Sequence, residues 1–222
     1  MNAAAIILAR GGSKGVPQKN VIPFCGKPLL AWTIQACKGA GLETYVSTDC
    51  SVIREAALVE GACVIDRPES LATDSATSES GWIHALDILS TQEKRFDWVV
   101  APQVTSPFTS RNDILLGLEM AFSGKYDSLF SASVFNDLMV WKDGKSVNYN
   151  SDSRGRRQQS SDTYIENGAF YIFTPHLIRT TDNRMGQEIG MVPMDPWKIF
   201  EIDTLEDVRV CSTLMREFLL DE

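Results

Sequence analysis

The 222-residue chain lacks several patterns that would assign it to a large class of proteins. Its five cysteines form no C-x-x-C pair, which argues against a zinc site or a dithiol redox motif and favours reduced thiols. No apolar run is long enough to cross a membrane, and the N-terminal one is too short for a signal peptide. We therefore expect a cytoplasmic protein that does not bind membranes.

Positive charge is also scarce. The chain has 21 Lys and Arg against 29 Asp and Glu, and this net charge of −8 argues against a nucleic-acid-binding surface. The 44% of apolar residues is enough for a sizeable core, and we expect a single domain over residues 1–222.

Strands and helices are predicted to alternate over the first half of the chain. The expected strands cover residues 3–9, 44–48, 62–65 and 98–101, and the expected helices cover 28–38, 51–60, 78–89 and 111–122. Repeated βα units predict a three-layer, Rossmann-like α/β fold with a mostly parallel sheet. Ligands bind such folds at the carboxyl ends of the strands, so the residues that follow each strand are the candidates for a site.

The pattern changes after residue 133. Asp143-Gly144 predicts the turn of a hairpin, and the polar, arginine-containing segment 148–163 is either a disordered loop or a flap that a ligand or a second subunit orders. Regular structure is expected again as strands over 168–173 and 198–202. A helix over 205–219 follows, with Thr204 as its N-cap.

The first loop has the composition of a phosphate-binding loop. Its glycines allow close approach of backbone N–H groups, and Arg10, Lys14 and Lys19 supply positive charge. The order Ser13-Lys14-Gly15 followed by Pro17 does not fit a Walker A loop, and the glycine spacing does not fit the Rossmann fingerprint. The alternative is a glycine-rich surface turn with incidental lysines.

Six motifs occur in one order along the chain: Ala9-Arg10-Gly11-Gly12-Ser13-Lys14-Gly15-Val16-Pro17-x-Lys19-Asn20, Val46-Ser47-Thr48-Asp49, Arg67-Pro68-Glu69-x-Leu71-Ala72-x-Asp74, Gln103-x-Thr105-Ser106-Pro107, Asn167-Gly168-Ala169 and Ile202-Asp203-Thr204. In these motifs the chain resembles the acylneuraminate cytidylyltransferases, or CMP-sialic acid synthetases, which include enzymes for legionaminic and pseudaminic acid. The resemblance implies that CTP and a nonulosonic acid react to give a CMP-sugar and pyrophosphate. It also implies a homodimer in which an insertion, residues 134–164, serves dimerisation and reaches the sugar site of the partner.

The resemblance implies a set of nucleotide-binding residues: Arg10, Gly11, Ser13, Lys14, Asn20, Arg67, Asp74, Thr77 and Ser78. Arg10 and Lys14 are also expected to be catalytic, with Lys14 offsetting charge in the transition state. Thr77 or Ser78 has a second interpretation as the cap of the following helix. Lys19 is either a ligand-binding residue or a solvated neighbour.

Nucleotidyl transfer calls for a metal ion as charge clamp, and we expect Mg²⁺, with Mn²⁺ able to substitute. Glu201 and Asp203 alternate at the end of the expected strand 198–202, so both would point to one side. Asp203 is the primary metal ligand and a catalytic residue. Glu201 is a secondary ligand, because the family pattern has Asp at its position. The alternative is a solvated strand edge.

By the same resemblance, the sugar-binding residues are Gln103, Thr105, Ser106 and Arg157. Some relatives carry Arg-Pro before Asn-Gly, whereas this chain has Ile165-Glu166 there, so the acceptor remains open among N-acetylneuraminic, legionaminic and pseudaminic acid. The alternatives are a CMP-Kdo synthetase and a non-catalytic nucleotide-binding subunit. The sequence does not identify a general base.

Overall fold

A seven-stranded sheet forms the centre of the computed structural model, which describes residues 1–12, 15–134, 139–152 and 163–220. In spatial order its strands are β11 (Ile189–Met194), β7 (Ser128–Val134), β10 (Tyr164–Phe173), β6 (Trp98–Pro102), β1 (Ala3–Leu8), β4 (Glu43–Thr48) and β5 (Cys63–Asp66). Neighbouring strands pair in parallel except β10, which is antiparallel to both β6 and β7. The predicted mostly parallel sheet is confirmed.

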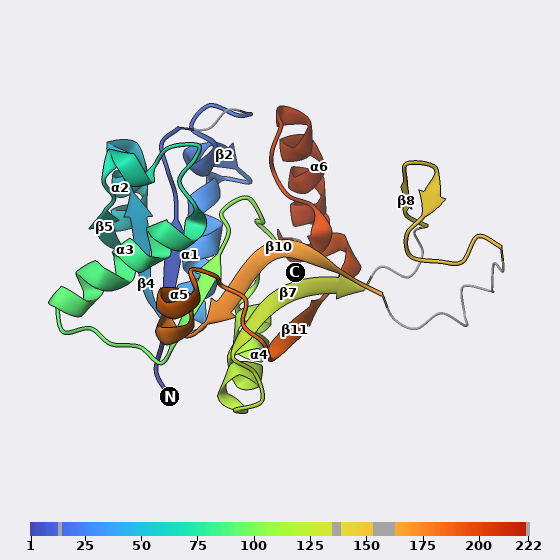
Figure 1. The fold of residues 1–222 in the computed structure, drawn as a ribbon. Coiled ribbons are helices and arrows are strands. Elements are labelled where there is room, and N and C mark those ends of the chain that lie inside the picture. Colours follow the sequence, from blue (N-terminus) through green and yellow to red (C-terminus); the bar gives the residue numbers. More distant parts are fainter. Residues whose placement is uncertain (13–14, 135–138, 153–162, 221–222) are drawn as a thin grey trace.

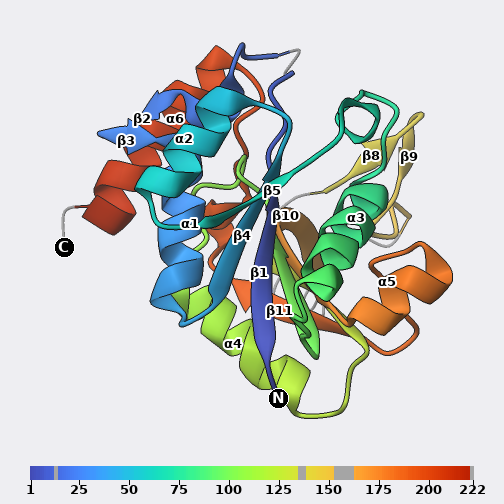
Figure 2. The same cartoon turned by 90° about the vertical axis from the view of Figure 1, so that its left-hand side faces the viewer.

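Helices cover both faces of the sheet, as the two views show (Figures 1 and 2). One face carries α1 (Leu29–Gly39), α2 (Ser51–Val59), α4 (Arg111–Phe122) and α6 (Leu205–Met215). The other face carries α3 (Ser78–Thr91) and α5 (Pro175–Thr181). This is the three-layer α/β/α architecture that the sequence predicted.

Strand β1 shows why the sheet needs both layers. Ala5 and Ile7 pack into the hydrophobic cluster beneath α1, whereas Ala4 and Ile6 pack into the cluster beneath α3. Alternate side chains of a strand point to opposite faces, so a strand that is apolar throughout is buried only when both faces are covered. Each isoleucine buried in this way stabilises the fold by about 1.5–3 kcal/mol.

Side-chain caps fix the beginnings of the helices that border the site. Thr204 and Asp207 form a capping box at α6, as predicted for Thr204, and Ser110 and Asp113 form another at α4. Thr77 accepts a hydrogen bond from the Ser80 amide and caps α3, which confirms that interpretation of Thr77. Each cap contributes about 1 kcal/mol. Helix α6 ends in one π-helical turn, Arg216–Leu220.

The expected strand over 198–202 is wrong. The chain there forms a 3₁₀ helix, η4 (Pro196–Ile199), followed by irregular backbone. Pro196 takes the first helical position, where its fixed φ and missing N–H fit. The strand lies earlier, as β11, and its Pro193 is tolerated because β11 is at the edge of the sheet.

Strand β10 begins at Tyr164, four residues before the expected start, because Tyr164 pairs with Val134 of β7. Sequence patterning did not indicate β7. It lies between the edge strand β11 and strand β10, so tertiary pairing decided its structure.

Short elements complete the fold. Strands β2 (Pro23–Phe24) and β3 (Lys27–Pro28) form one hairpin, and β8 (Trp141–Lys142) and β9 (Lys145–Ser146) form another. Asp143 and Gly144 have φ angles of 51° and 75°, as the predicted Asp-Gly turn requires. The β8–β9 hairpin projects away from the sheet (Figure 1). Two 3₁₀ helices, η1 (Lys19–Val21) and η2 (Glu69–Leu71), lie in the loops after β1 and β5.

None of the helices in the described ranges has the length and apolar character needed to span a bilayer.

Candidate active site

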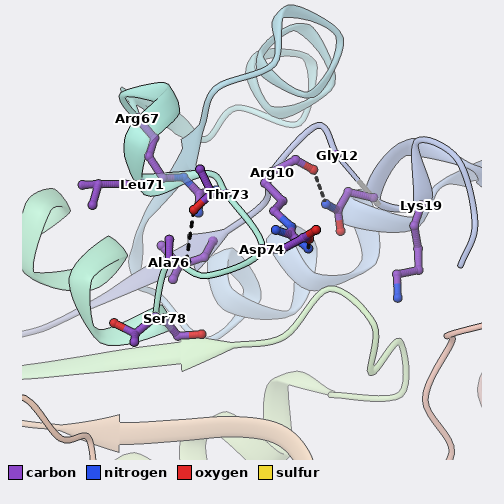
Figure 3. A pocket seen from close by; sticks show the side chains of 12 residues that line it. Arg10, Gly12, Lys19, Arg67, Leu71, Thr73, Asp74, Ala76 and Ser78 are labelled. Carbon is purple, nitrogen blue, oxygen red and sulfur yellow. Dashed lines mark hydrogen bonds and ion pairs between the residues drawn. The ribbon is translucent and has the colours of Figure 1, made fainter. Parts of the chain in front are cut away.

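A pocket of about 330 Å³ lies at the edge of the sheet where β1 and β5 end. Figure 3 shows the residues that line it, which are Leu8, Arg10, Gly12, Lys19, Asn20, Arg67, Leu71, Thr73, Asp74, Ala76, Thr77 and Ser78. They include six of the nine predicted nucleotide-binding residues. Gly11 is adjacent in sequence, whereas Ser13 and Lys14 lie outside the described residues.

The loop after β1 is held by its own polar groups. The Gly11 amide donates to Asp49 Oδ1 at 3.0 Å, and Asn20 Nδ2 donates to the carbonyl oxygen of Arg10 at 2.9 Å. A Cβ at Gly15 would lie 2.2 Å from the carbonyl oxygen of Asp203, so only glycine fits there. The loop therefore packs directly on the backbone of a predicted metal ligand almost two hundred residues later.

Arg10 and Asp74 point toward each other across the mouth of the pocket (Figure 3). Arg10 Nη2 lies 2.7 Å from Asp74 Oδ1, and the two side chains are 34% and 52% exposed. A pair this exposed contributes roughly 0–1 kcal/mol, so an incoming phosphate can compete with Asp74 for the guanidinium.

Arg67 lies deeper and is only 8% exposed. Its Nη2 donates to the carbonyl oxygen of Ser47 at 2.7 Å, whereas its Nε is buried without a hydrogen-bond partner among the described residues. Burial lowers the pKa of Arg67, the charge of Asp49 raises it, and that of Arg10 lowers it. An unpaired buried donor costs about 1–3 kcal/mol. A cationic donor left unpaired beside a pocket is therefore a position for a polar ligand.

The N-terminus of α3 forms one wall of the pocket through Thr77 and Ser78. Thr77 uses Oγ1 for its cap and still lines the cavity, so the two interpretations of this residue hold together. The amide groups of a first helical turn point outward and favour anions or hydrogen-bond acceptors.

Glu201 and Asp203 lie beside the loop, on the irregular backbone after η4. The Ile202 amide between them donates to the carbonyl oxygen of Thr105 at 2.8 Å, which fixes the segment against the loop after β6. Asp203 Oδ1 lies 2.8 Å from Lys19 Nζ, and the Lys19 side chain is 15% exposed. Lys19 is thus a paired residue of the pocket and not the solvated neighbour that the sequence left open.

The Glu201 side chain packs against Gly168, where a Cβ would lie 2.0 Å from its Oε1. Burial raises the pKa of Glu201, the negative charge of Asp203 raises it further, and Lys19 lowers it. The two carboxylates therefore repel each other electrostatically, although no strand alternation aligns them as predicted. Within the described ranges, no group of three or more His, Cys, Asp and Glu could hold a metal, so this pair would depend on ligand phosphates and water to complete a shell.

Three of the predicted sugar-binding residues follow β6, and Arg157 lies outside the described residues. Gln103 is half-buried, and its backbone amide donates to the carbonyl oxygen of Ala169 at 2.9 Å. Thr105 lies beside the carboxylate segment through its bond to Ile202. Ser106 is 2% exposed, with its Oγ buried and unpaired among the described residues.

Sequence reasoning missed a polar network along β10. The Tyr171 hydroxyl donates to Glu166 Oε1 at 2.5 Å, and burial raises the pKa of Tyr171. Arg184 lies 4.5 Å over the Tyr171 ring and 4.8 Å over the Trp82 ring, and its Nε is 2.8 Å from Glu79 Oε1. The network joins the first turn of α3 to the stretch 164–166 that the sequence marked as a departure. No sequence signal indicated Arg184.

A three-layer α/β sheet with a cationic, glycine-rich loop and a nearby carboxylate pair supplies the charged groups that nucleotidyl transfer requires. The family model for cytidylyltransferases matches residues 4–215, and the chain belongs to this family. This match and the curated relatives together confirm the resemblance noted in the sequence motifs.

Among curated relatives, a pseudaminic acid cytidylyltransferase of Campylobacter jejuni is 29% identical over 225 residues, which cover 97% of each chain. An N-acylneuraminate cytidylyltransferase A of Danio rerio is 34% identical over 185 residues. That alignment covers 79% of this chain and 42% of the fish protein, so the chain matches less than half of that relative's length.

Among solved structures, a CMP:2-keto-3-deoxy-manno-octonic acid synthetase superposes with a TM-score of 0.71. The match covers 99% of this chain and 100% of the other at 16% sequence identity. At this identity the likeness establishes the shared fold.

Proposed function

We propose that the protein transfers CMP from CTP to a nonulosonic acid. The anomeric hydroxyl oxygen of the acid attacks the α-phosphorus and its proton is released to water. The bond from that phosphorus to the oxygen that bridges to the β-phosphate breaks, and pyrophosphate leaves with the electron pair. The observation that carries the proposal is the pocket beside the glycine-rich loop. Arg67 lines this pocket and is buried, and its Nε has no hydrogen-bond partner among the described residues. Membership in the cytidylyltransferase family and the likeness to sialic-type relatives support the choice of nucleotide and acceptor.

The pocket residues divide by chemistry into two sets. Arg67, Asp74, Thr77 and Ser78 offer the mixture of donors and acceptors that a cytosine edge needs, and such a site rejects other bases by leaving polar groups unpaired. Arg10, Asn20, the Gly11 region and the neighbouring Ser13 and Lys14 would hold the triphosphate, and Lys14 would offset charge at the α-phosphate.

Mg²⁺, or Mn²⁺ in its place, would be held by Asp203 and Glu201. The donors fit, because two repelling carboxylates, one with a raised pKa, are stabilised by a cation between them. When bound, the metal would neutralise triphosphate charge. Lys19 holds the Asp203 carboxylate in place through its 2.8 Å ion pair.

The acceptor would lie against the loop after β6, between Gln103, Thr105 and Ser106 and the Glu166–Tyr171 pair. Arg157 would reach the acid from the insertion, residues 134–164. N-acetylneuraminic, legionaminic and pseudaminic acid are the candidates, and full-length alignment with the Campylobacter relative favours pseudaminic acid. The alternative of a CMP-Kdo synthetase has a shared fold as its support, at 16% identity.

The insertion would also form a homodimer in the cytoplasm. Trp141 in the β8–β9 hairpin is 55% exposed, and Val147, which follows β9, is 61% exposed, which gives apolar surface suited to a second copy of the chain. Sizing with light scattering should give twice the 24.6 kDa chain mass, and a monomer at micromolar concentration would contradict the proposal.

One experiment tests the function directly. The protein is incubated with Mg²⁺, each of the four nucleoside triphosphates, and N-acetylneuraminic, legionaminic, pseudaminic or Kdo acid, and pyrophosphate is measured. We expect release from CTP that depends on one nonulosonic acid. Release with Kdo alone would favour the alternative enzyme. Binding of CTP without release for any acid would indicate a non-catalytic nucleotide-binding subunit.

A further inference from the structure

Lys198 is a buried lysine without a role in the site described so far. Its side chain is 6% exposed, and its Nζ lies 3.0 Å and 2.8 Å from the two carboxylate oxygens of Asp113. Asp195 Oδ2 is the next oxygen, at 3.6 Å. Lysine is rarely buried unless it is paired, and removing an ammonium group from water costs free energy that such pairing must offset.

The same carboxylate of Asp113 also binds the end of the acceptor loop, defined as residues 103–110. Asp113 Oδ2 accepts hydrogen bonds from the Ser110 amide at 2.8 Å and from Ser110 Oγ at 2.6 Å. The acceptor loop also contains Gln103 and Thr105. The carboxylate of Asp113 therefore joins this loop, the first turn of α4 and Lys198.

Lys198 belongs to η4 and directly precedes the carboxylate segment, defined as residues 199–203. Two further contacts join this region to the acceptor loop. The Ile202 amide donates to Thr105, and the rings of Trp197 and Phe108 meet edge to face with centroids 5.1 Å apart. The Lys198–Asp113 ion pair differs from these two contacts because it holds a charged group. It therefore restricts both the distance between η4 and the first turn of α4 and their relative orientation.

We propose that the Lys198–Asp113 pair is a positioning device that sets the spacing between the acceptor loop and the carboxylate segment. Its consequence for catalysis rests on the proposed function, because these two segments would carry the acceptor sugar and the metal-binding carboxylates. A shift of about 1 Å in such a contact can lower the rate on the order of a hundredfold. Lys198 is thus a positioning residue that acts through the two segments.

The sharpest variant is the double substitution Lys198→Met with Asp113→Asn. It removes both charges together, and so avoids the penalty of one buried unpaired charge. The asparagine side-chain oxygen can still accept from the Ser110 amide, which keeps the cap of α4. The matched control is Lys94→Met, which breaks an ion pair with Glu43 whose side chains are 46% and 52% exposed, beside the start of β4.

In the double variant we expect the KM for the nonulosonic acid to rise on the order of tenfold or more, while the KM for CTP changes by less than about twofold. The Lys94→Met protein should keep both values. An unchanged acid KM in a cooperatively melting double variant would overturn the proposal. Equal rises in both KM values would also overturn it, because they would indicate general loosening.

Hydrogen exchange gives a readout that needs no turnover. Peptides covering residues 103–110 and 199–203 should exchange faster in the double variant, whereas those covering 3–8 in β1 should not. Unchanged exchange in the two segments would refute the positioning role, whether or not the wild-type protein releases pyrophosphate. Failure of the wild-type protein to release pyrophosphate would refute the proposed function and leave the exchange test in place. If the double variant does not fold, Asp113→Asn alone should give the same pattern, because Lys198 keeps Asp195 as a counter-charge.

Discussion

The two halves of the candidate site are built in different ways. The loop half, residues 9–20 and 66–78, follows directly from parallel strands and carries a pocket with an unpaired buried arginine group. The strand half, residues 103–110, 164–171 and 199–203, depends on the antiparallel strand β10 and on ion pairs between distant segments.

The two halves also differ in whether their buried polar groups are paired, and this indicates different functions for them. In the loop half, the buried Nε of Arg67 has no hydrogen-bond partner among the described residues, although Arg67 lines the pocket, and an unpaired group of this kind suits a charged and polar ligand. The strand half also contains one such group, Ser106 Oγ, but the ion pairs that border this half, Lys198–Asp113 and Arg184–Glu79, are satisfied by the protein itself. We infer that the loop half supplies nucleotide binding common to the family, and that the strand half sets the geometry of the acceptor.

The largest expected effect comes from Asp203→Ala, at the contact between the halves. Asp203 is held by Lys19 and touches Gly15 through its backbone, so its loss removes a carboxylate from the proposed metal site while the loop keeps its contact. We expect kcat/KM for pyrophosphate release to fall on the order of a hundredfold to a thousandfold. Initial rates over a Mg²⁺ titration measure this. Full activity at limiting Mg²⁺ would show that Asp203 does not bind the metal.

Arg67→Met tests the loop half alone. Loss of the buried guanidinium removes a charge-assisted donor, so CTP should bind on the order of tenfold to a hundredfold more weakly, as measured by calorimetry. The acid KM should change little, because Arg67 lines the pocket after β5 and not the acceptor loop.

The control for this variant is Arg54→Met. Arg54 lines a neighbouring cavity with Arg67 but forms an exposed ion pair with Asp66. The Arg54→Met variant should bind CTP with an affinity within about twofold of the wild-type value, because exposed ion pairs contribute little. If both substitutions weakened CTP binding equally, the specific role of Arg67 would be refuted.

The same contrast explains how much the sequence could predict. The elements of the loop half, such as the strand over 3–9 and the helix from Ser78, have local signals in apolar runs and caps. Their boundaries came within two residues of the structure. The pocket residues Arg10, Asn20 and Arg67 were likewise predictable, because each follows a strand or belongs to a motif.

The strand half carried weaker signals. Pro193 and Gly190 interrupt the apolar pattern of β11, and the buried Lys198 resembles a surface residue in sequence. Glu201 and Asp203 were assigned to a strand that does not form, although the turn after η4 still places them within electrostatic reach. Long-range pairings decide these positions, and a single sequence does not record them.

The smallest expected effect concerns Glu201, which joins the strand half to the proposed metal. Its pKa is raised in the folded protein, first by burial and then by Asp203, so the folded state binds its proton more tightly than the unfolded chain does. The stabilisation from this proton is present at low pH and is lost as pH rises through the raised pKa. Glu201→Gln should therefore raise Tm at pH 7 without metal, by about 1–3 °C.

The gain from Glu201→Gln should shrink as the pH falls toward 4, where the wild-type carboxyl is itself protonated, and added Mg²⁺ should stabilise the wild-type protein more than the variant. Thermal melts at pH 7 and pH 4, with and without Mg²⁺, measure both effects. A lower Tm for Glu201→Gln at pH 7 would show that Glu201 is stabilised as a carboxylate by the strand half itself. The carboxylate pair would then be a structural feature of that half and no longer the contact through which a metal joins it to the loop half.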